Sequence, residues 1–212
     1  MNTMSDQLTL FERLGIFVKR DFLDIPFCQQ ILAETRQTKI SRPGQIYMGK
    51  GESVVDESAR KVQQTALSKL TVQTVYQQLR AIQPQLEEKF KVKLVGCEGP
   101  NFLFYQKGGF YLPHTDRDFS DEDFQHMNKR RVTAVIFVNG EGQNNEMGTM
   151  DTYEGGALMF YELLKNEKAS QYGLSLNGQP GLLVAFDSDL THEVQPVTAG
   201  ERLTIVTWFL GE

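Results

Sequence analysis

The sequence predicts a mainly β fold with supporting helices, whose core is a double-stranded β-helix, or jelly roll. From about residue 92 onward, the chain runs in roughly eight short apolar segments separated by glycine and aspartate turns, a pattern typical of packed antiparallel sheets. Between about residues 21 and 91, apolar residues instead recur at helical spacing. No Pro- or Ser-rich linker divides the 212 residues. We therefore expect one domain over residues 1–212, with helical support at about 21–91 and the jelly-roll core at about 92–210.

The first part of the chain is expected to form a strand and several helices. Residues 15–20 predict the strand, and Asp24 suits the N-cap of a helix that follows. The apolar face of that helix would consist of Ile25, Cys28, Ile31 and Leu32. A second helical stretch would bring together Val62, Ala66, Leu67 and Leu70, and a third Val72, Val75, Tyr76, Leu79 and Ile82. Pro84 is expected to break or restart the third helix, because proline lacks the N–H that a helix interior uses.

Three stretches are longer than the usual four to six residues of a connection, namely residues 41–56, 140–154 and 166–180. Long ordered loops often serve as lids or binding loops, so these stretches could shape substrate entry. Surface insertions that the fold tolerates would explain them equally well. The sequence leaves both alternatives open.

Charge and composition narrow the classes of function. The formal net charge is −5 and no basic stripe occurs, so a nucleic-acid partner is not expected. No stretch reaches the roughly 20 apolar residues of a membrane-spanning helix, and residues 1–10 lack a signal-peptide pattern, so we expect a cytoplasmic protein without membrane association. Cys28 and Cys97 have no metal-type spacing and are expected to be reduced. The sequence does not determine the oligomeric state.

Three residues far apart in the chain, His114, Asp116 and His192, have the chemistry of one metal site. In an extended segment successive side chains point to opposite faces, so His114 and Asp116 project together. Two imidazoles and one carboxylate that leave the other coordination positions open suit a non-haem ferrous ion reacting with oxygen. An isolated His-x-Asp pair is more often a buried histidine and aspartate that satisfy each other, so the surrounding sequence decides.

The segments around these residues predict strands that deliver them to one place. Residues 105–114 indicate a strand, a glycine turn and a second strand that ends at His114. Residues 181–186 form a buried apolar strand, followed by a turn and then His192. Residues 202–209 predict another strand with alternating faces. One face of that strand would carry Arg202, Thr204, Val206 and Trp208.

With these features, the chain resembles the iron(II)- and 2-oxoglutarate-dependent dioxygenases, and among them the prolyl 4-hydroxylases. The resemblance covers about residues 16–209 and is most specific from Tyr105 onward. Four stretches carry it: residues 105–116, the strand at 131–139, the Gly155-Gly156 turn with residues 157–158, and residues 192–208. The resemblance implies Fe(II), O2 and 2-oxoglutarate as co-substrate, with ascorbate as an additional reductant.

The same resemblance implies a role for each matching residue. The iron ligands, and thus the catalytic residues, would be His114, Asp116 and His192. The co-substrate contacts would be Arg202, Tyr105 and Thr204, with Arg202 binding the distal carboxylate through its planar, permanently charged fork. Substrate contacts are expected from Tyr111, Arg131 and Trp208. The structural alternatives are aromatic packing for the two tyrosines, a pocket wall for Trp208 and a solvated strand end for Arg131.

Two positions refine the resemblance. The oxygen-sensing branch of the family has a tyrosine where this chain has Phe137, and the spacing from His192 to Arg202 is more similar to collagen-type and bacterial prolyl hydroxylases. Related halogenases have a small residue where this chain has Asp116, so halogenation is not expected.

Three functions remain open. The first is hydroxylation of an unactivated C–H bond in a prolyl residue of a peptide or protein. The second is hydroxylation of a free amino acid or other small metabolite, which the same centre would serve. The third is a non-catalytic jelly-roll sensor that binds a metal without turnover.

Overall fold

The structure, a computed structural model, describes residues 4–47, 53–117, 127–142, 152–163 and 172–212. Its helices are α1 (Met4–Arg13), α2 (Ile25–Gln37), α3 (Lys69–Phe90) and a short 3-10 helix, η2 (Met127–Lys129). The strands of the first part are β1 (Phe17–Lys19), β2 (Ser41–Pro43), β3 (Ile46–Tyr47), β4 (Ser53–Val54), β5 (Arg60–Lys61), β6 (Gln63–Thr65), β7 (Leu94–Cys97), β8 (Asn101–Tyr105) and β9 (Phe110–His114). The later strands are β10 (Arg130–Phe137), β11 (Gly140–Glu141), β12 (Thr152–Gly155), β13 (Leu158–Phe160), β14 (Leu174–Leu176), β15 (Leu183–Asp187), β16 (His192–Val194), β17 (Val197–Ala199) and β18 (Arg202–Gly211).

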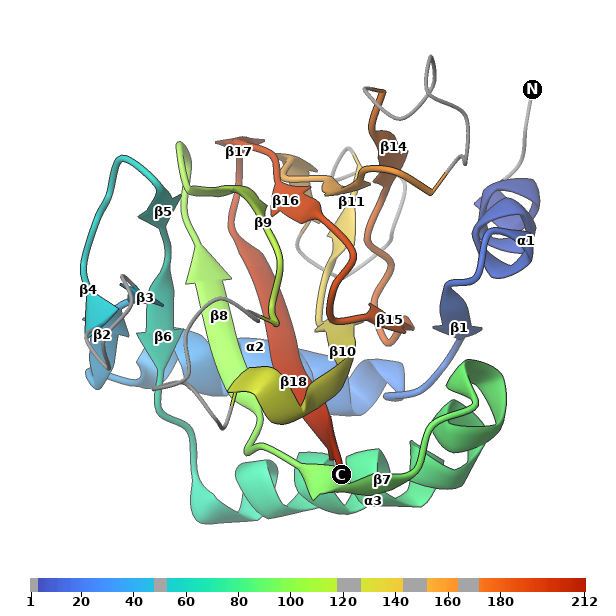
Figure 1. The fold of residues 1–212 in the computed structure, drawn as a ribbon. Helices are drawn as coiled ribbons and strands as arrows, with labels where there is room; N and C mark the ends of the chain where they lie inside the picture. The colour runs from blue at the N-terminus through green and yellow to red at the C-terminus, as the bar shows by residue number, and fades with distance from the viewer. Residues whose placement is uncertain (1–3, 48–52, 118–126, 143–151, 164–171) are drawn as a thin grey trace.

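Two antiparallel sheets form the framework (Figure 1). The larger sheet has the order β1-β15-β10-β18-β8-β6-β2, with β7 paired to β18, and the second has the order β14-β13-β16-β9-β5. A three-stranded sheet, β11-β12-β17, lies near one end of the framework (Figure 1). Strands distant in sequence are thus neighbours, as in a jelly roll. The predicted fold class, mainly β with supporting helices around a jelly roll, is confirmed.

The larger sheet separates two apolar clusters, and β10 shows how the sequence divides between them. Val132, Ala134 and Ile136 belong to the cluster that also contains residues of α2 and α3. Val135 and Phe137 belong to the cluster inside the jelly roll. This alternation follows from the two-residue period of a strand. A sheet with apolar residues on both faces therefore packs on helices on one side and lines the barrel on the other.

Helices α2 and α3 lie along the outer face of the larger sheet (Figure 1). Asp24 caps α2 as expected, because its carboxylate accepts a 2.8 Å hydrogen bond from the Phe27 backbone N–H. Ser68 caps α3 in the same way through the N–H of Thr71. The buried side of α3 consists of Thr71, Val75, Leu79, Ile82 and Leu86. These helices shield the sheet from water and leave its inner face for the site.

Several expectations for the first part of the chain are wrong. Residues 60–61 and 63–65 are strands, not the start of a second helix, and Leu70 is exposed at the beginning of α3. Pairing of β5 with β9 and of β6 with β8 outweighs the helical spacing of the apolar residues there. Pro84 lies within α3 and does not end it. Ile25 and Tyr76, expected on the apolar faces of α2 and α3, are exposed.

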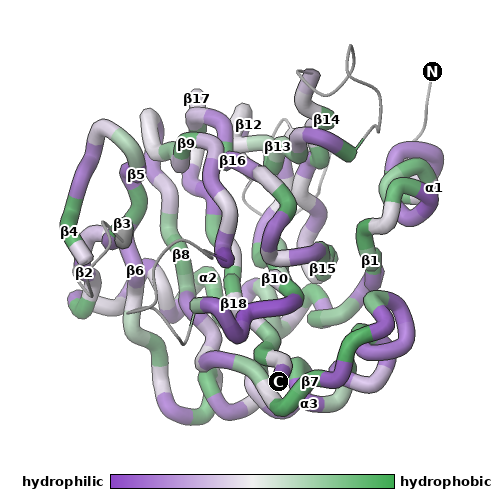
Figure 2. Tube along the Cα trace, viewed as in Figure 1, coloured by the Kyte–Doolittle hydropathy of each residue, from purple (hydrophilic) through white to green (hydrophobic). Residues whose placement is uncertain are grey.

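The helix α1 was not expected from the sequence. It buries Leu8 and Phe11 in the inner apolar cluster, and Figure 2 shows green and purple residues alternating along it, as in an amphipathic helix. None of the helices in the described ranges combines the length and apolar character that a membrane crossing needs. Of the three long loops expected, residues 48–52, 143–151 and 164–171 lie outside the described residues.

Candidate active site

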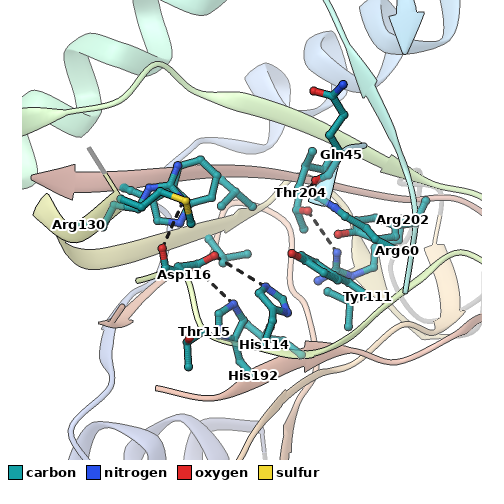
Figure 3. Close-up of a pocket in the computed structure, with 18 residues that line it drawn as sticks. Gln45, Arg60, Tyr111, His114, Thr115, Asp116, Arg130, His192, Arg202 and Thr204 are labelled. Carbon is teal, nitrogen blue, oxygen red and sulfur yellow. Dashed lines mark hydrogen bonds and ion pairs between the residues drawn. The ribbon is translucent and has the colours of Figure 1, made fainter. Parts of the chain in front are cut away.

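The strand register brings His114, Asp116 and His192 together. Strands β9 and β16 pair so that His192 lies directly opposite His114. Asp116 follows two residues after His114, and its backbone N–H donates a 3.0 Å hydrogen bond to the Ser188 carbonyl oxygen. The turn before β16 thus holds the carboxylate beside the two imidazoles. Figure 3 shows the three side chains converging at one side of a pocket.

Backbone carbonyl groups fix the orientation of both imidazole rings. The Nδ1 atom of His114 lies 2.8 Å from the Leu112 carbonyl oxygen, and that of His192 lies 2.9 Å from the Leu190 carbonyl oxygen. A carbonyl oxygen can only accept, so each Nδ1 carries the proton. Each Nε2 therefore keeps its lone pair for a metal ion, which is the arrangement usual for metal-binding histidines.

The carboxylate of Asp116 lies between the two Nε2 atoms. Its oxygens are 3.7 Å from His114 Nε2 and 3.4 Å from His192 Nε2. Burial, with the neighbouring His192, lowers the pKa of His114 to about 3. Burial would raise the pKa of Asp116, but the neighbouring imidazoles and hydrogen bonds outweigh it and the pKa is lowered. A neutral His114 imidazole and an ionised Asp116 carboxylate are the protonation states that a divalent metal requires of such ligands.

Two buried hydroxyl groups, those of Thr133 and Ser188, form a hydrogen-bonded chain that ends at the Asp116 carboxylate. Thr133, on β10, donates a 2.8 Å hydrogen bond to Asp116 Oδ2. The Thr133 hydroxyl also lies 3.1 Å from the hydroxyl of Ser188. Both residues are almost completely buried. The hydroxyl pair restrains the carboxylate, so that it need not reorganise when it binds a cation.

The three side chains of the triad line a pocket of about 640 Å³, a volume that includes the solvent space at its entrance. On its wall lie Tyr105, Arg202, Thr204, Val206 and Trp208, so the predicted inward face of β18 is confirmed as a structural feature. Strand pairing places Arg202 opposite Tyr105, and the guanidinium carbon lies 5.0 Å from the centre of the phenol ring. A pocket with a few polar groups on an apolar wall has the lining of a small-ligand site.

Arg202 is a buried cation with unused donors. Its exposed fraction is 1%, and among the described residues its only hydrogen bond runs from Nη1 to the Thr204 hydroxyl, 3.2 Å away. In the part of the chain that the structure describes, its Nε and Nη2 atoms are buried without a hydrogen-bond partner. A buried charge needs compensation, and a planar guanidinium binds a carboxylate through two parallel hydrogen bonds. The donor set therefore fits an anion such as a carboxylate.

Tyr111 and Trp208 lie at the triad, where the sequence predicted substrate contacts. The Tyr111 ring stacks on His114 with ring centres 3.5 Å apart, and the guanidinium carbon of Arg60 lies 4.5 Å from the centre of the Tyr111 ring. The Arg130 guanidinium lies 3.7 Å from the centre of the Trp208 ring. Among the described residues, the Trp208 Nε1 atom is buried without a hydrogen-bond partner. Both aromatic residues line the pocket.

Arg131, the third predicted substrate contact, does not line this pocket. Its guanidinium instead donates to the carbonyl oxygens of Asn128 and Glu212. The neighbouring Arg130 lines the pocket, binds both oxygens of Glu98 at 2.6 and 3.0 Å, and donates to the Asp116 carbonyl oxygen. Sequence reasoning missed Arg130, Glu98 and the hydroxyl pair. Arg130 takes the pocket position expected for Arg131 because of a β-bulge. The register of β10 against β18 shifts between Arg130 and Val132, so Arg130 and not Arg131 faces inward.

Comparisons with known proteins agree with this geometry. Residues 100–210 match the model of the 2OG-Fe(II) oxygenase superfamily. A PKHD-type hydroxylase of Psychrobacter sp. (strain PRwf-1) is 28% identical over 110 residues, which are 51% of this chain and 36% of the relative. The match thus spans about a third of that protein's length.

Solved structures share the fold over nearly the whole chain. A prolyl-4-hydroxylase of Pseudomonas putida has a TM-score of 0.69 at 21% identity, with 99% of this chain and 100% of that chain covered. A prolyl hydroxylase of Trichoplax adhaerens, in complex with a peptide fragment of a hypoxia inducible factor, has a TM-score of 0.68 at 18% identity, with 98% and 89% covered. A viral collagen prolyl hydroxylase of Paramecium Bursaria Chlorella virus-1, in complex with 2-oxoglutarate (2OG), has a TM-score of 0.62 at 14% identity, with 93% and 96% covered.

The chain belongs to the 2OG-Fe(II) oxygenase superfamily. Membership of this superfamily implies Fe(II), 2-oxoglutarate and O2. The residues fit this set. Two imidazole Nε2 atoms and one carboxylate suit ferrous iron, and the Nε and Nη2 donors that Arg202 leaves unused among the described residues suit the keto acid.

Proposed function

We propose that this protein hydroxylates an unactivated C–H bond in a prolyl residue of a peptide or protein. The observation that supports this most is one pocket that joins the His114, Asp116 and His192 triad to the buried Arg202. In the proposed site the triad holds Fe(II), and Arg202 with Thr204 and Tyr105 binds 2-oxoglutarate. When bound, the ferrous ion would supply the oxygen chemistry that the side chains themselves lack.

The chain's own residues would contribute position and electrostatics. Arg202 orients the keto acid through its distal carboxylate, and the apolar wall from Val206 and Leu158 limits the access of water. Arg130 and Glu98 fix the Trp208 ring at the triad side, and Tyr111 restrains the His114 ring by stacking. Tyr111 and Trp208 are therefore our candidates for contacts with the substrate.

A coupled assay tests the substrate class. Proline-containing peptides and free amino acids are each incubated with Fe(II) and 2-oxoglutarate, and succinate release is measured together with a product that gains one oxygen. We expect coupled turnover with peptides. Turnover with free amino acids alone would instead favour a small-metabolite hydroxylase, and iron binding without any 2-oxoglutarate consumption would favour a sensor.

Replacement of Arg202, the proposed anchor of the 2-oxoglutarate carboxylate, gives a second test. Arg202→Ala should weaken 2-oxoglutarate binding by at least roughly 30-fold, because it removes a desolvated charge-assisted pair. Binding of Mn(II), measured separately by calorimetry, should stay near the wild-type affinity. Normal 2-oxoglutarate affinity in this variant would contradict the proposed anchor.

A further inference from the structure

Several buried polar atoms without a hydrogen-bond partner belong to Arg202 and to two residues near it. Within the described part of the chain, the buried atoms Tyr153 Oη, Glu141 Oε2, Arg202 Nε and Arg202 Nη2 make no hydrogen bond. They come from β12, β11 and β18, so three separate segments deliver them to one region. The exposed fraction of Tyr153 is 1%, and the residue belongs to the inner apolar cluster.

Two glycines allow the Tyr153 phenol to lie close to Arg202. A Cβ atom at Gly156 would lie 2.9 Å from Arg202 Cδ and 3.4 Å from Tyr153 Cε2, so the ring edge and the arginine border the same point. A Cβ atom at Gly178 would lie 2.3 Å from the Tyr153 hydroxyl oxygen. Both glycines therefore leave space that the phenol and the arginine occupy.

The pKa values of Tyr153 and Glu141 agree with a position of both residues near Arg202. Burial raises the pKa of Tyr153 to about 12, although the positive charge of Arg202 acts in the opposite direction. Burial likewise raises the pKa of Glu141, again against the effect of Arg202. The phenol is thus a neutral hydroxyl group at neutral pH. Its oxygen is able to accept a hydrogen bond from the guanidinium.

A buried hydroxyl without a partner is unfavourable for the protein alone. Leaving such a group unsatisfied costs about 1–3 kcal/mol, whereas a phenylalanine would fill nearly the same space without this cost. The hydroxyl group at position 153 therefore does not improve the fold of the ligand-free chain. Its place beside the unpartnered donors of Arg202 indicates a role when the anion is bound.

We propose that Tyr153 is a positioning residue of the co-substrate anchor, an inference that rests on the proposed function. When the anion is bound, the Tyr153 hydroxyl oxygen accepts one of the five N–H donors of Arg202 and fixes the rotation of the guanidinium. Two parallel donors then bind the distal carboxylate of 2-oxoglutarate. The bound anion thereby neutralises the buried charge of Arg202, and the Tyr153 phenol maintains the orientation of the guanidinium.

The experiment compares Tyr153→Phe with the wild type and with Tyr161→Phe. Tyr161 donates to Glu193 and does not line the pocket, so its variant controls for loss of a phenol hydroxyl. Calorimetry of 2-oxoglutarate with the Mn(II)-loaded protein should show about 3- to 10-fold weaker binding in Tyr153→Phe, since one net hydrogen bond is lost. Tyr161→Phe should bind as the wild type does.

The melting temperature without any ligand separates positioning from a structural role. We expect Tyr153→Phe to melt at the wild-type temperature or above it, because an unpartnered polar group is removed. Unchanged 2-oxoglutarate affinity would overturn the inference, and so would weaker affinity accompanied by a lower melting temperature. If Arg202→Ala loses 2-oxoglutarate while Tyr153→Phe binds it normally, only this inference fails. If the wild type binds no 2-oxoglutarate, the proposed function fails as well.

Discussion

At the scale of single residues, the site depends on groups that orient the candidate ligands as well as on the ligands themselves. Carbonyl oxygens fix both histidine rings, and hydroxyl groups restrain Asp116. Alternation along a strand was enough to predict that His114 and Asp116 share a face. It was not enough to find Thr133 or Ser188, because neither contact is local in sequence.

Thr133→Val tests the support of the carboxylate. The change keeps the side-chain shape and removes the hydroxyl that donates to Asp116. We expect about 10- to 100-fold weaker Mn(II) binding by calorimetry, the usual effect of losing a hydrogen bond to a ligating group. Thr35→Val, which removes a buried hydroxyl bonded to Ile31 within α2, should leave the affinity unchanged. Equal Mn(II) affinity in the two variants would rule out this support.

At the scale of secondary-structure elements, register and turns decide which residues meet. Pairing of β9 with β16 brings His114 opposite His192, and pairing of β8 with β18 brings Tyr105 opposite Arg202. The face of β18 could be predicted from its alternation. The inward position of Arg130 could not, because a bulge changes the alternation of β10 and leaves no clear signal in the sequence.

Gly156, between β12 and β13, and Gly108, between β8 and β9, offer a matched pair of glycine substitutions. Gly156 and Gly108 both have φ near +70 to +80°, at +68° and +79°, so alanine at either costs about 1–2 kcal/mol of unfolding free energy. Of the two, only the Gly156 Cβ would meet Arg202, since no atom of the described residues lies within 4 Å of a Cβ at Gly108. We expect Gly156→Ala alone to weaken 2-oxoglutarate binding in calorimetry. Similar losses of affinity in both variants would mean that the Arg202 contact is not the cause.

At the scale of the whole molecule, helices cover one face of the larger sheet and the site occupies the other. The outer cluster with α2 and α3 is separate from the inner cluster behind the pocket. The polar site therefore lies in a barrel whose fold is stabilised mainly by apolar contacts. We propose that residues 1–212 act as one domain, since α1 near the start packs into the same inner cluster as β16 near the end.

Metal binding should stabilise the entire fold by mass action. With Mn(II) at about 100 times its dissociation constant, the expected gain is about 2.7 kcal/mol, or roughly 5–10 °C in melting temperature for a chain of this size. His192→Ala should show no such shift, because one of the three candidate ligands is missing. Differential scanning fluorimetry with and without Mn(II) measures both values. An equal shift in His192→Ala would place the metal elsewhere.

The sequence by itself determined the mainly β fold, the metal-type triad and the inward face of β18. Each of these follows from local periodicity or from the chemistry of a few residue types, both of which can be read along the chain. Only the tertiary structure decided that residues 60–65 are strands, that Arg130 and not Arg131 faces the pocket, and that Tyr153 lies beside Arg202. These features depend on long-range pairing, a bulge and close approach at glycines, and such contacts are set by the packed fold as a whole.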